Sequence, residues 1–371
     1  MIYNSSVINM NIKKILAPTL IIILQGCTTN TYVKEKVEYQ QLPGWSNGNQ
    51  IGAIAALKNS CINIIANKKS TSNWKKVCNN IIKKKFTNTT KSRHFIEKNF
   101  TPYKISVKDY SDGHFTGYYQ PSIEGSRVKT KKFITPIYKK PDDLIVKKKK
   151  NNQSVFGRKQ NGMFTPYYSR KEISNNNLIP KKYIIAWLPS RIDRTFLQIQ
   201  GSGQIRFQDG TKILVGYDGQ NGHPYKPIGK LLLENNEIPR HEISMQSIKA
   251  WLIANPKKAS DVLNYDPSFV FFRVLNNKQP IGAQGIELTP KVSMAIDWRY
   301  TKYGTPIWLD TQYKTSDGTN HQFRKLMIAQ DTGGAIRGPN RGDIFWGEGL
   351  EAEYIAGHMN NKGKMWVLLP N

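Results

Sequence analysis

Two aspartates near the C-terminus, Asp331 and Asp343, stand 12 positions apart in a segment that is rich in glycine. A short apolar run ends at Asp331, and Asp343 opens an aromatic run directly after Gly342. Five glycines between positions 333 and 347 allow a backbone to approach a ligand closely. If both carboxylates face one groove, the pair is suited to general acid–base chemistry. The same aspartates are equally consistent with turn residues that accept hydrogen bonds from backbone N–H groups.

Other kinds of catalytic site find little support in the sequence. None of the six histidines has the spacing of a metal-ligand set, and the zinc-protease pattern His-Glu-x-x-His is absent. Gly201-Ser202-Gly203 lacks the Gly-x-Ser-x-Gly pattern of a nucleophile elbow. We therefore expect no metal ion and no cofactor.

Cys61 and Cys78 lie on the apolar faces of two predicted helices, with a Ser-Thr-Ser cluster at 70–72 between them. A catalytic cysteine requires an exposed, electropositive setting, which neither position offers. In an exported protein the two cysteines are expected to form a disulfide that joins a helical hairpin. Two buried free thiols are the alternative.

The first residues of the chain have the features of a lipoprotein signal peptide. Two lysines at positions 13 and 14 precede the apolar run Ile15–Leu24, and the sequence Leu-Gln-Gly before Cys27 is similar to a bacterial lipobox. We expect cleavage after residue 26 and a lipid on Cys27, with an uncleaved anchor as the alternative. Thr28 at the next position, rather than an aspartate, indicates sorting to the outer membrane. Translation starts at one of two methionines, Met1 or Met10.

From about residue 115 the sequence consists of short apolar or alternating runs bounded by Gly, Pro, Asn and Asp. This pattern is typical of β-barrels and β-sandwiches. The predicted strands are 115–119, 184–188, 196–200, 213–215, 269–272, 306–309, 326–329 and 366–369. Two helical patterns interrupt them, around residues 228–232 and 245–252. The predicted fold class is therefore mostly β with peripheral helices.

The formal charge of +29, from 55 Lys and Arg against 26 Asp and Glu, has two interpretations. Nucleotide bias would leave the many lysines solvated on the surface, whereas a functional role would be attraction to an anionic polymer. Nucleic acid is a poor candidate partner, because the chain is expected to be exported and has no zinc-finger spacing and no RNP-like aromatic pair. The anionic peptide stems of the cell wall are a better one.

Several blocks in a fixed order carry a family resemblance. The segment from Asp331 through Gly-Gly-Ala-Ile to Asp343 resembles the lytic murein transglycosylase A (MltA) family, whose members are outer-membrane lipoproteins. Further blocks similar to this family are Phe115-Thr-Gly-Tyr-Tyr119, Gln200-Gly-Ser-Gly203, Asn221-Gly-His223 with Ile228-Gly-Lys230, Ser244-Met-Gln246 and Pro267–Phe272. The blocks run from residue 115 to the C-terminus, about two thirds of the chain.

The resemblance implies a double-psi β-barrel that carries an inserted, smaller β-barrel-like domain, with a groove for a glycan strand between the two. On this chain we assign residues 1–26 to the signal peptide, 27–48 to a tether, 49–120 to an N-terminal helical part and the first segment of the barrel, 121–277 to the inserted domain and 278–371 to the rest of the catalytic barrel.

The implied reaction is the non-hydrolytic cleavage of the β-1,4 bond between N-acetylmuramic acid and N-acetylglucosamine, which leaves a 1,6-anhydromuramoyl end. Asp343 matches the catalytic aspartate of the family and would act first as the acid and then as the base. Asp331 would position the substrate or support the transition state, with a structural turn carboxylate as the alternative. Ile344, Phe345 and Trp346 would raise the pKa of the acid by desolvation.

The resemblance also implies residues that contact the glycan. Thr116 matches a substrate-contacting threonine of the family, and Gln200, Gly201 and Gly203 would line the groove from the inserted domain. Three aromatic side chains either stack on sugars or belong to the core: Tyr118, Tyr119 and Trp346.

Some alternatives stay open at this point. Glu348 is a rival acid, because the segment 347–352 is acidic. A non-catalytic peptidoglycan-binding lipoprotein, a muramidase that uses water and a general binder of anionic polymers are the competing functions. The expected partners are peptidoglycan glycan strands, outer-membrane lipids through the N-terminal anchor, and murein synthases or divisome proteins. The expected location is the periplasmic face of the outer membrane of a Gram-negative bacterium.

Overall fold

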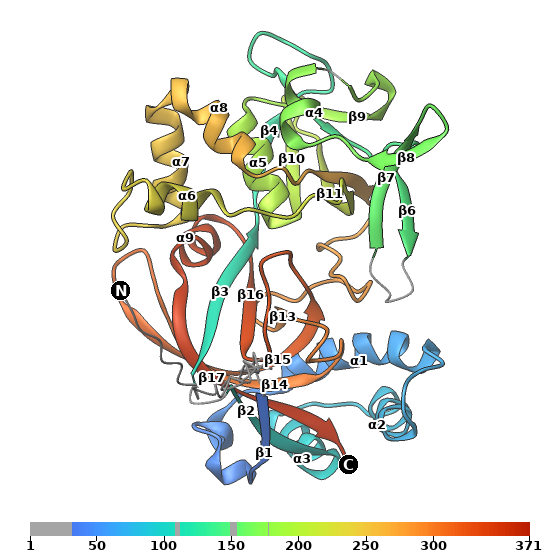
Figure 1. Cartoon of the computed structure of the whole chain (residues 1–371). Coiled ribbons are helices and arrows are strands. Elements are labelled where there is room, and N and C mark those ends of the chain that lie inside the picture. The colour runs from blue at the N-terminus through green and yellow to red at the C-terminus, as the bar shows by residue number, and fades with distance from the viewer. Residues whose placement is uncertain (1–31, 108–111, 149–153, 177) are drawn as a thin grey trace, which may run out of the picture. The chain divides into compact units, whose positions relative to one another are not determined.

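The computed structural model describes residues 32–107, 112–148, 154–176 and 178–371 (Figure 1). The predicted signal peptide, the lipidated Cys27 and both candidate start positions lie outside these residues. Among the described helices, none is long and apolar enough to cross a membrane.

Six strands form a closed barrel, because the C-terminal strand β17 pairs with β14 on one side and with β3 on the other. The order around the barrel is β17-β14-β15-β13-β16-β3, and β2 and β1 extend the sheet beyond β17. The bounds of these strands are β1 Tyr32–Lys36, β2 Phe100–Val107, β3 Gly113–Gln120, β13 Ser293–Ile296, β14 Pro306–Lys314, β15 Asn320–Asp331, β16 Arg341–Glu348 and β17 Asn360–Pro370.

One hydrophobic cluster joins side chains from all six barrel strands and forms the barrel core. Met294, Met327 and Ile344 are completely buried in it, and Trp346 lies two residues beyond Ile344 on the same face of β16. The helix α9 (Leu350–His358) follows β16 and adds Ile355 to this cluster. The alternate residues of β13 and β16 are thereby left to face the opposite side of the sheet.

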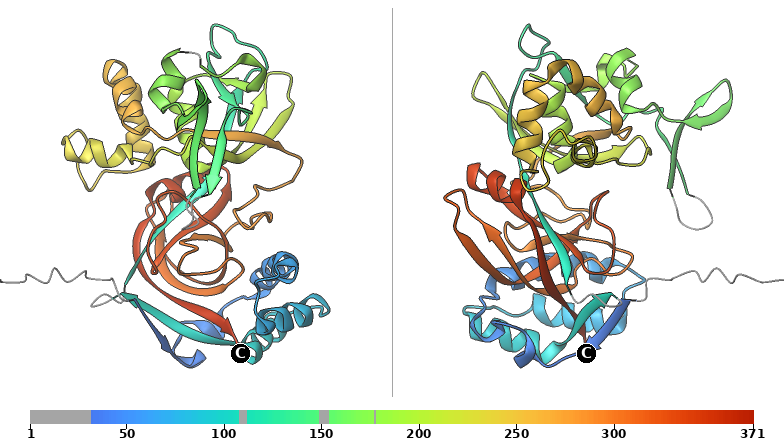
Figure 2. Two further views of the ribbon diagram at one scale, coloured as in Figure 1. Left: turned by 45° about the vertical axis from the view of Figure 1, so that its right-hand side comes forward. Right: turned by 60° about the vertical axis from the view of Figure 1, so that its left-hand side comes forward.

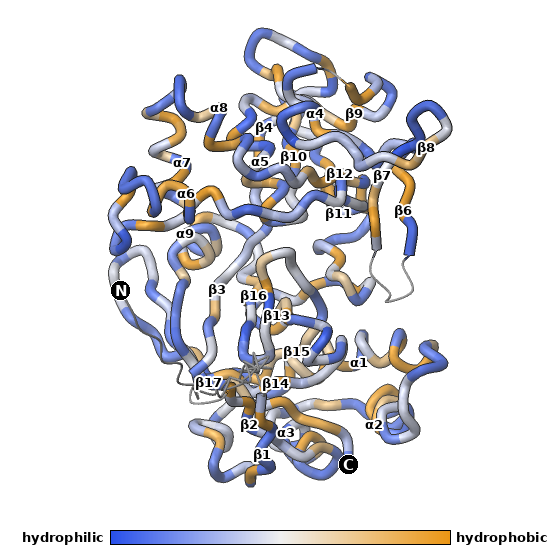
Figure 3. The backbone as a smooth tube through the Cα atoms, viewed as in Figure 1, coloured by the Kyte–Doolittle hydropathy of each residue, from blue (hydrophilic) through white to orange (hydrophobic). Residues whose placement is uncertain are grey.

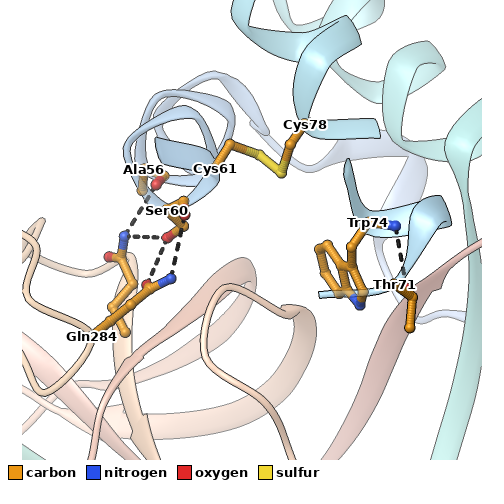
Figure 4. Close-up of a disulfide and its surroundings, with 8 residues drawn as sticks. Ala56, Ser60, Cys61, Thr71, Trp74, Cys78 and Gln284 are labelled. Carbon is orange, nitrogen blue, oxygen red and sulfur yellow. Dashed lines mark hydrogen bonds between the residues drawn. A yellow bond between two sulfur atoms is a disulfide. The ribbon is translucent and has the colours of Figure 1, made fainter. Parts of the chain in front are cut away.

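Three N-terminal helices, α1 (Ile51–Ala66), α2 (Ser72–Ile82) and α3 (Thr89–Asn99), pack against the outer side of the barrel. Apolar residues of α1 such as Leu57 lie in one cluster with Trp308 of β14 and Ile328 of β15. Hydrophobic and hydrophilic segments both occur along α1 and α2, as expected for helices that cover a core (Figure 3). A disulfide between Cys61 and Cys78 joins α1 to α2 (Figure 4).

Residues 32–48, which the sequence analysis assigned to a tether, are ordered into β1 and two short 3-10 turns, η1 (Tyr39–Gln41) and η2 (Trp45–Asn47). The strand β1 pairs with β2 along its whole length. Trp45 stacks edge-on against Trp308, with 5.0 Å between the ring centroids. The polar texture that suggested a tether reflects an edge strand whose side chains are largely exposed while its backbone groups are paired.

The residues between β3 and β13 form a second β region with hydrophobic clusters of its own (Figures 1 and 2). Its sheets have the orders β12-β11-β10-β4, β5-β9 and β6-β7-β8. The strands are β4 Ser122–Gly125, β5 Thr135–Tyr138, β6 Ile145–Lys148, β7 Ser154–Gln160, β8 Met163–Pro166, β9 Ile184–Leu188, β10 Ser202–Phe207, β11 Lys212–Gln220 and β12 Val270–Leu275. The helical elements are α4 Arg170–Asn176, η3 Lys181–Tyr183, α5 Arg191–Gln200, α6 Ile228–Glu234, α7 Met245–Ala254 and α8 Pro256–Tyr265. The predicted mostly-β class with N-terminal helices is confirmed.

The predicted strand at residues 196–200 is wrong, because these residues are the last part of α5. Ser190 caps the start of that helix by accepting a hydrogen bond from the Asp193 backbone N–H, and Gly201 ends it with a φ of 78°. Over five residues an alternating pattern does not distinguish a strand from one face of a helix.

In this second β region, which is inserted between β3 and β13, a buried ion pair joins the start of α4 to the residue after α8. Arg170 Nη2 donates to Asp266 Oδ2 over 3.1 Å, and both side chains are 2% exposed. Burial lowers the pKa of Arg170, while Asp266 opposes that change. Removal of either partner would leave a buried charge without compensation, so the loss of one partner should strongly destabilise the protein.

Candidate active site

The two aspartates lie at the same level of the barrel sheet, on the strands that flank β13. Ala295 of β13 pairs with Asp331 of β15 on one side and with Asp343 of β16 on the other. Asp343 pairs in turn with Thr116 of β3. Partners in register project their side chains to the same face of a sheet. Four neighbouring strands therefore bring both carboxylates and the threonine into one row.

Asp343 is held by a side chain from the adjacent strand. Thr116 Oγ1 donates a hydrogen bond to Asp343 Oδ1 over 2.6 Å, and Arg341 Nη2 donates to Thr116 Oγ1 over 2.7 Å. Burial raises the pKa of Asp343, and the Arg341 charge and the Thr116 hydrogen bond oppose only part of that effect. Burial therefore shifts the pKa of this carboxyl group in the direction that a general acid needs.

Asp331 is held mainly by the backbone. The N–H groups of Ala283 and Thr332 donate to Asp331 Oδ1 over 2.8 and 2.9 Å. The Tyr118 hydroxyl donates to Asp331 Oδ2 over 2.8 Å. Burial raises the pKa of Asp331 to about 6 although these three hydrogen bonds favour the anion, and the charge of Asp343 adds to the increase. Both aspartates keep part of their surface exposed, so a ligand can reach them.

A small apolar cluster lies on the face of the sheet that carries the aspartates. It consists of Tyr118, Leu288, Ala295, Ile336 and Phe345. Phe345 pairs in register with Tyr118, and their ring centroids are 5.3 Å apart. This cluster covers one side of the carboxyl row and contributes to the burial that raises the pKa of both aspartates.

The expectation that Ile344, Phe345 and Trp346 all desolvate the acid is correct only for Phe345. Ile344 and Trp346 belong to the barrel core on the other face of β16, because successive side chains of a strand point to opposite faces. Tyr118, Tyr119 and Trp346 are each less than 10% exposed, so they belong to the core rather than to an exposed stacking surface.

The residues expected on the inserted side lie where that region meets the barrel. Gln200 Oε1 accepts a hydrogen bond from the backbone N–H of Tyr119 over 3.0 Å, which ties the end of α5 to β3. Gly201 adopts a left-handed conformation, with a φ of 78°. At Gly203 an added Cβ would lie 2.4 Å from Leu197 Cδ1. Backbone conformation thus accounts for Gly201 and close packing for Gly203, and a contact of either with glycan stays a prediction.

Glu348, the rival acid, is at the far end of β16. Its side chain is exposed, and its Oε2 accepts a hydrogen bond from Gln120 Nε2 over 3.2 Å. A register irregularity separates it from Phe345. It therefore has neither the burial nor the partners that distinguish the two aspartates.

Several groups of the site were not predicted from the sequence. Arg341 lies two positions before Asp343, and the period of a strand would have placed it on the same face. The role of the Tyr118 hydroxyl and of the Ala283 N–H gives no local sequence signal, because both act across more than 40 positions of the chain. Within the described ranges, no group of three or more His, Cys, Asp and Glu side chains is arranged to hold a metal ion.

Comparison with known proteins identifies the family of this chain. The sequence matches the MltA specific insert domain over residues 114–273 and the 3D domain over residues 292–369. It is 33% identical over 266 residues to the membrane-bound lytic murein transglycosylase A homolog of Buchnera aphidicola, covering 71% of this chain and 68% of that protein. The chain belongs to the MltA family. The resemblance inferred from the sequence blocks is therefore confirmed.

Solved MltA structures share the fold. A membrane-bound lytic murein transglycosylase from Agrobacterium tumefaciens superimposes with a TM-score of 0.81 at 28% identity, covering 91% of this chain and 97% of that one. Escherichia coli MltA with bound chitohexaose gives a TM-score of 0.67 at 27% identity, covering 91% of each chain.

Proposed function

We propose that this protein cleaves the β-1,4 bond between N-acetylmuramic acid and N-acetylglucosamine of peptidoglycan without water, and so leaves 1,6-anhydromuramoyl ends. Membership of the MltA family supports a lyase that acts on peptidoglycan. The observation that carries the proposal is the register of β15, β13, β16 and β3, which aligns Asp331, Asp343 and Thr116 on one face. Chitohexaose bound to Escherichia coli MltA supports a glycan strand as the ligand.

Asp343 serves both proton transfers in this mechanism. Its neutral carboxyl donates a proton to the glycosidic oxygen as the bond from that oxygen to C1 of the muramoyl ring breaks. The C6 hydroxyl of the same ring then closes on C1, and the Asp343 carboxylate takes its proton. The carboxyl returns to its starting state, and no water molecule has to be placed, in contrast to ordinary glycosidases. The raised pKa of Asp343 supports this assignment.

Asp331 and Thr116 support the acid in different ways. With a pKa raised to about 6, Asp331 is mostly ionised at neutral pH, so its negative charge stabilises the positive charge that develops on the sugar ring. The Thr116 hydroxyl, bound to Arg341, orients the Asp343 carboxyl toward the groove. Gln200, Gly201 and Gly203 lie on the inserted side, where they are proposed to contact the strand.

The protein is proposed to work at the periplasmic face of the outer membrane, held there by a lipid on Cys27. The lipobox-like sequence before Cys27 supports the anchor, and the relatives from Buchnera aphidicola and Escherichia coli are named as membrane-bound. Murein synthases or divisome proteins are proposed as partners at that location. The assigned boundaries, with an inserted domain over 121–277 and the catalytic segment over 278–371, are part of the same proposal.

The deciding experiment is the mass of the products released from purified sacculi. Wild-type protein is expected to release muropeptides that are lighter than hydrolysed ones by one water, because the ring closes on itself. Asp343→Asn should fold and release them at least about 10³-fold more slowly. Asp317→Asn is the matched control, since this exposed aspartate lies in the turn between β14 and β15 and should leave the release rate unchanged. Products with reducing ends would instead identify a muramidase, and binding without release would identify a non-catalytic lipoprotein.

A further inference from the structure

The helix α1 carries three polar groups that face the barrel. Ser60 Oγ donates to Gln284 Oε1 over 2.9 Å (Figure 4) and accepts a hydrogen bond from Gln330 Nε2 over 2.8 Å. The Ala56 carbonyl accepts from the same Gln330 nitrogen over 3.1 Å, and Asn63 Nδ2 donates to the Gln284 carbonyl over 2.7 Å. Positions three and four apart on a helix face the same side, so these groups form one contact surface.

This surface is connected to Asp331 by two consecutive backbone amides. The Gln284 N–H donates to the Gln330 carbonyl over 3.0 Å, and the Ala283 N–H donates to Asp331 Oδ1 over 2.8 Å. The preceding residue is Gly282, where an added Cβ would lie 2.5 Å from the Gln330 carbonyl oxygen. The loop therefore lies directly on the end of β15, with the Gln284 and Ala283 amides hydrogen-bonded to consecutive residues of that strand.

The Ser60 and Gln330 side chains at this contact surface are buried and fully hydrogen-bonded. Ser60 and Gln330 are fully buried, and Ser293 Oγ donates to Gln330 Oε1 over 2.6 Å, which occupies the remaining side of that amide. Buried networks whose members are all satisfied hold one geometry, because each lost partner leaves a desolvated polar group. The neighbour of Ser60 is Cys61, whose disulfide with Cys78 ties α1 to α2 (Figure 4).

We propose that α1 positions the Asp331 carboxylate, with Ser60 and Gln284 as positioning residues that aim the Ala283 N–H at it. The inference rests on the proposed function, since it assigns a support to one of its two carboxylates. The N-terminal helices then do more than cover the barrel: their buried face sets the geometry and the proton affinity of a group in the active site.

Other groups also act on Asp331, and they remain in place when the α1 network is broken. Tyr118 of β3 donates to Oδ2, Asp343 of β16 adds a negative charge, and Tyr303 lies within electrostatic range. The Thr332 N–H shares Oδ1 with Ala283. Since the Ala283 hydrogen bond lowers the pKa of Asp331, misplacing that N–H alone should raise it.

The test compares Gln284→Ala and Ser60→Ala with Thr71→Ala. Thr71 caps α2 by accepting a hydrogen bond from the Trp74 N–H, so its loss weakens the helical hairpin without touching the loop (Figure 4). The carboxyl carbons of aspartate, labelled with ¹³C, are titrated by NMR in the free protein. In both network variants the pKa of Asp331 is expected to rise. The acidic limb of the pH–rate profile should move to higher pH, with kcat lowered about tenfold and KM little changed.

The proposal is overturned if folded Gln284→Ala keeps the wild-type pKa of Asp331, or if Thr71→Ala moves it equally. Should Ser60→Ala fail to fold, Gln284→Ala still decides the question, because Gln284 is partly exposed and its side chain is not part of a core. The titration does not depend on turnover. A wild-type protein that releases no anhydro products would overturn the proposed function, while the titration would still decide the role of α1.

Discussion

Asp331 and Asp343 both pair with Ala295, yet their surroundings differ. Asp331 receives three hydrogen bonds, two from backbone N–H groups and one from a phenol. Among the described residues, the one hydrogen bond to the Asp343 carboxyl group comes from Thr116 and reaches Oδ1. Each donor that binds a carboxylate favours the anion. The two aspartates therefore occupy equivalent positions of one sheet with different hydrogen-bond partners, and the proposed roles of anion and acid follow this difference. Burial raises the pKa of both, so the variants below test which of the two carries the proton.

Replacing each aspartate by asparagine in turn is the strongest test of the proposed division of roles. Asp343→Asn removes the acid and the base, so the rate of anhydro-end release from sacculi should fall by about 10³-fold or more. Asp331→Asn keeps a polar group but loses the charge, and a loss of about 10- to 100-fold is expected. Equal losses in the two variants would show that the roles are not divided as proposed.

Stability should respond to Asp331 in the opposite direction from activity. Its pKa is raised from 3.8 to about 6 in the folded protein, so the folded state binds this proton more readily than the unfolded chain. Ionisation therefore destabilises the folded state fully above pH 6 and not at all below 3.8. Two pKa units correspond to at most about 3 kcal/mol. Asp331→Asn should increase the free energy of unfolding by about 1–3 kcal/mol near pH 8 and have little effect near pH 4.

Urea unfolding at the two pH values measures this effect, and Asp317→Asn provides the opposite control. Hydrogen bonds from Thr315 and Thr319 lower the pKa of Asp317 to about 2, so its ionised form is the stabilising one. Asp317→Asn should therefore decrease stability near pH 8. The same sign for both variants would contradict the raised pKa of Asp331.

Thr116→Val tests the side-chain support of Asp343. The Thr116 hydrogen bond lowers the pKa of Asp343, so its removal should raise that pKa and keep the acid protonated to higher pH. The basic limb of the pH–rate profile should then move upward, while the maximal rate falls about tenfold because the carboxyl is less well oriented. Thr116→Ser retains the hydroxyl and should restore both. An unmoved basic limb in the valine variant would remove Thr116 from this role.

Tyr118→Phe tests the other carboxylate with a smaller change. The phenol hydrogen bond lowers the pKa of Asp331, so its loss should raise that pKa. Because Asp331 acts as an anion, the acidic limb moves upward this time, with a rate loss of about threefold at the optimum. If the threonine and tyrosine variants move the same limb, the assignment of acid and anion is incorrect.

The sequence was sufficient to single out the two aspartates as candidates, but not the groups that distinguish their surroundings. The glycine-rich segment and the family blocks identified Asp331, Asp343 and Thr116, and a strand period of two residues would have put Phe345, not Ile344, beside the acid. The Ala283 N–H could not be found in this way. Its hydrogen bond to Asp331 spans 48 positions and comes from a backbone N–H group, which every residue except proline has.

The fold, too, could be predicted from the sequence only in part. Short apolar runs correctly indicated a mostly-β chain, since strand spacing and turn residues are local properties. The closure of the barrel through β17 and β3, and the helix at 196–200, depend on contacts distant in sequence and on caps at Ser190 and Gly201. The pairing of β1 with β2 is likewise a contact between distant residues. The polar side chains of residues 32–36 alone suggested a tether.

Glu348→Gln should have the smallest effect of all. Glu348 lies on the same strand as Asp343. The variant therefore tests whether a carboxylate on β16 contributes to the rate without the burial and the hydrogen-bond partners of Asp343. The Glu348 side chain is exposed and accepts only the Gln120 amide among the described residues, a bond that glutamine can replace through its own carbonyl oxygen. Less than a twofold change in rate is expected, since this side chain is exposed and lies apart from the row of residues around Ala295. A loss comparable to that of Asp343→Asn would make Glu348 the acid, and the row of residues around Ala295 would then be a structural feature of the barrel.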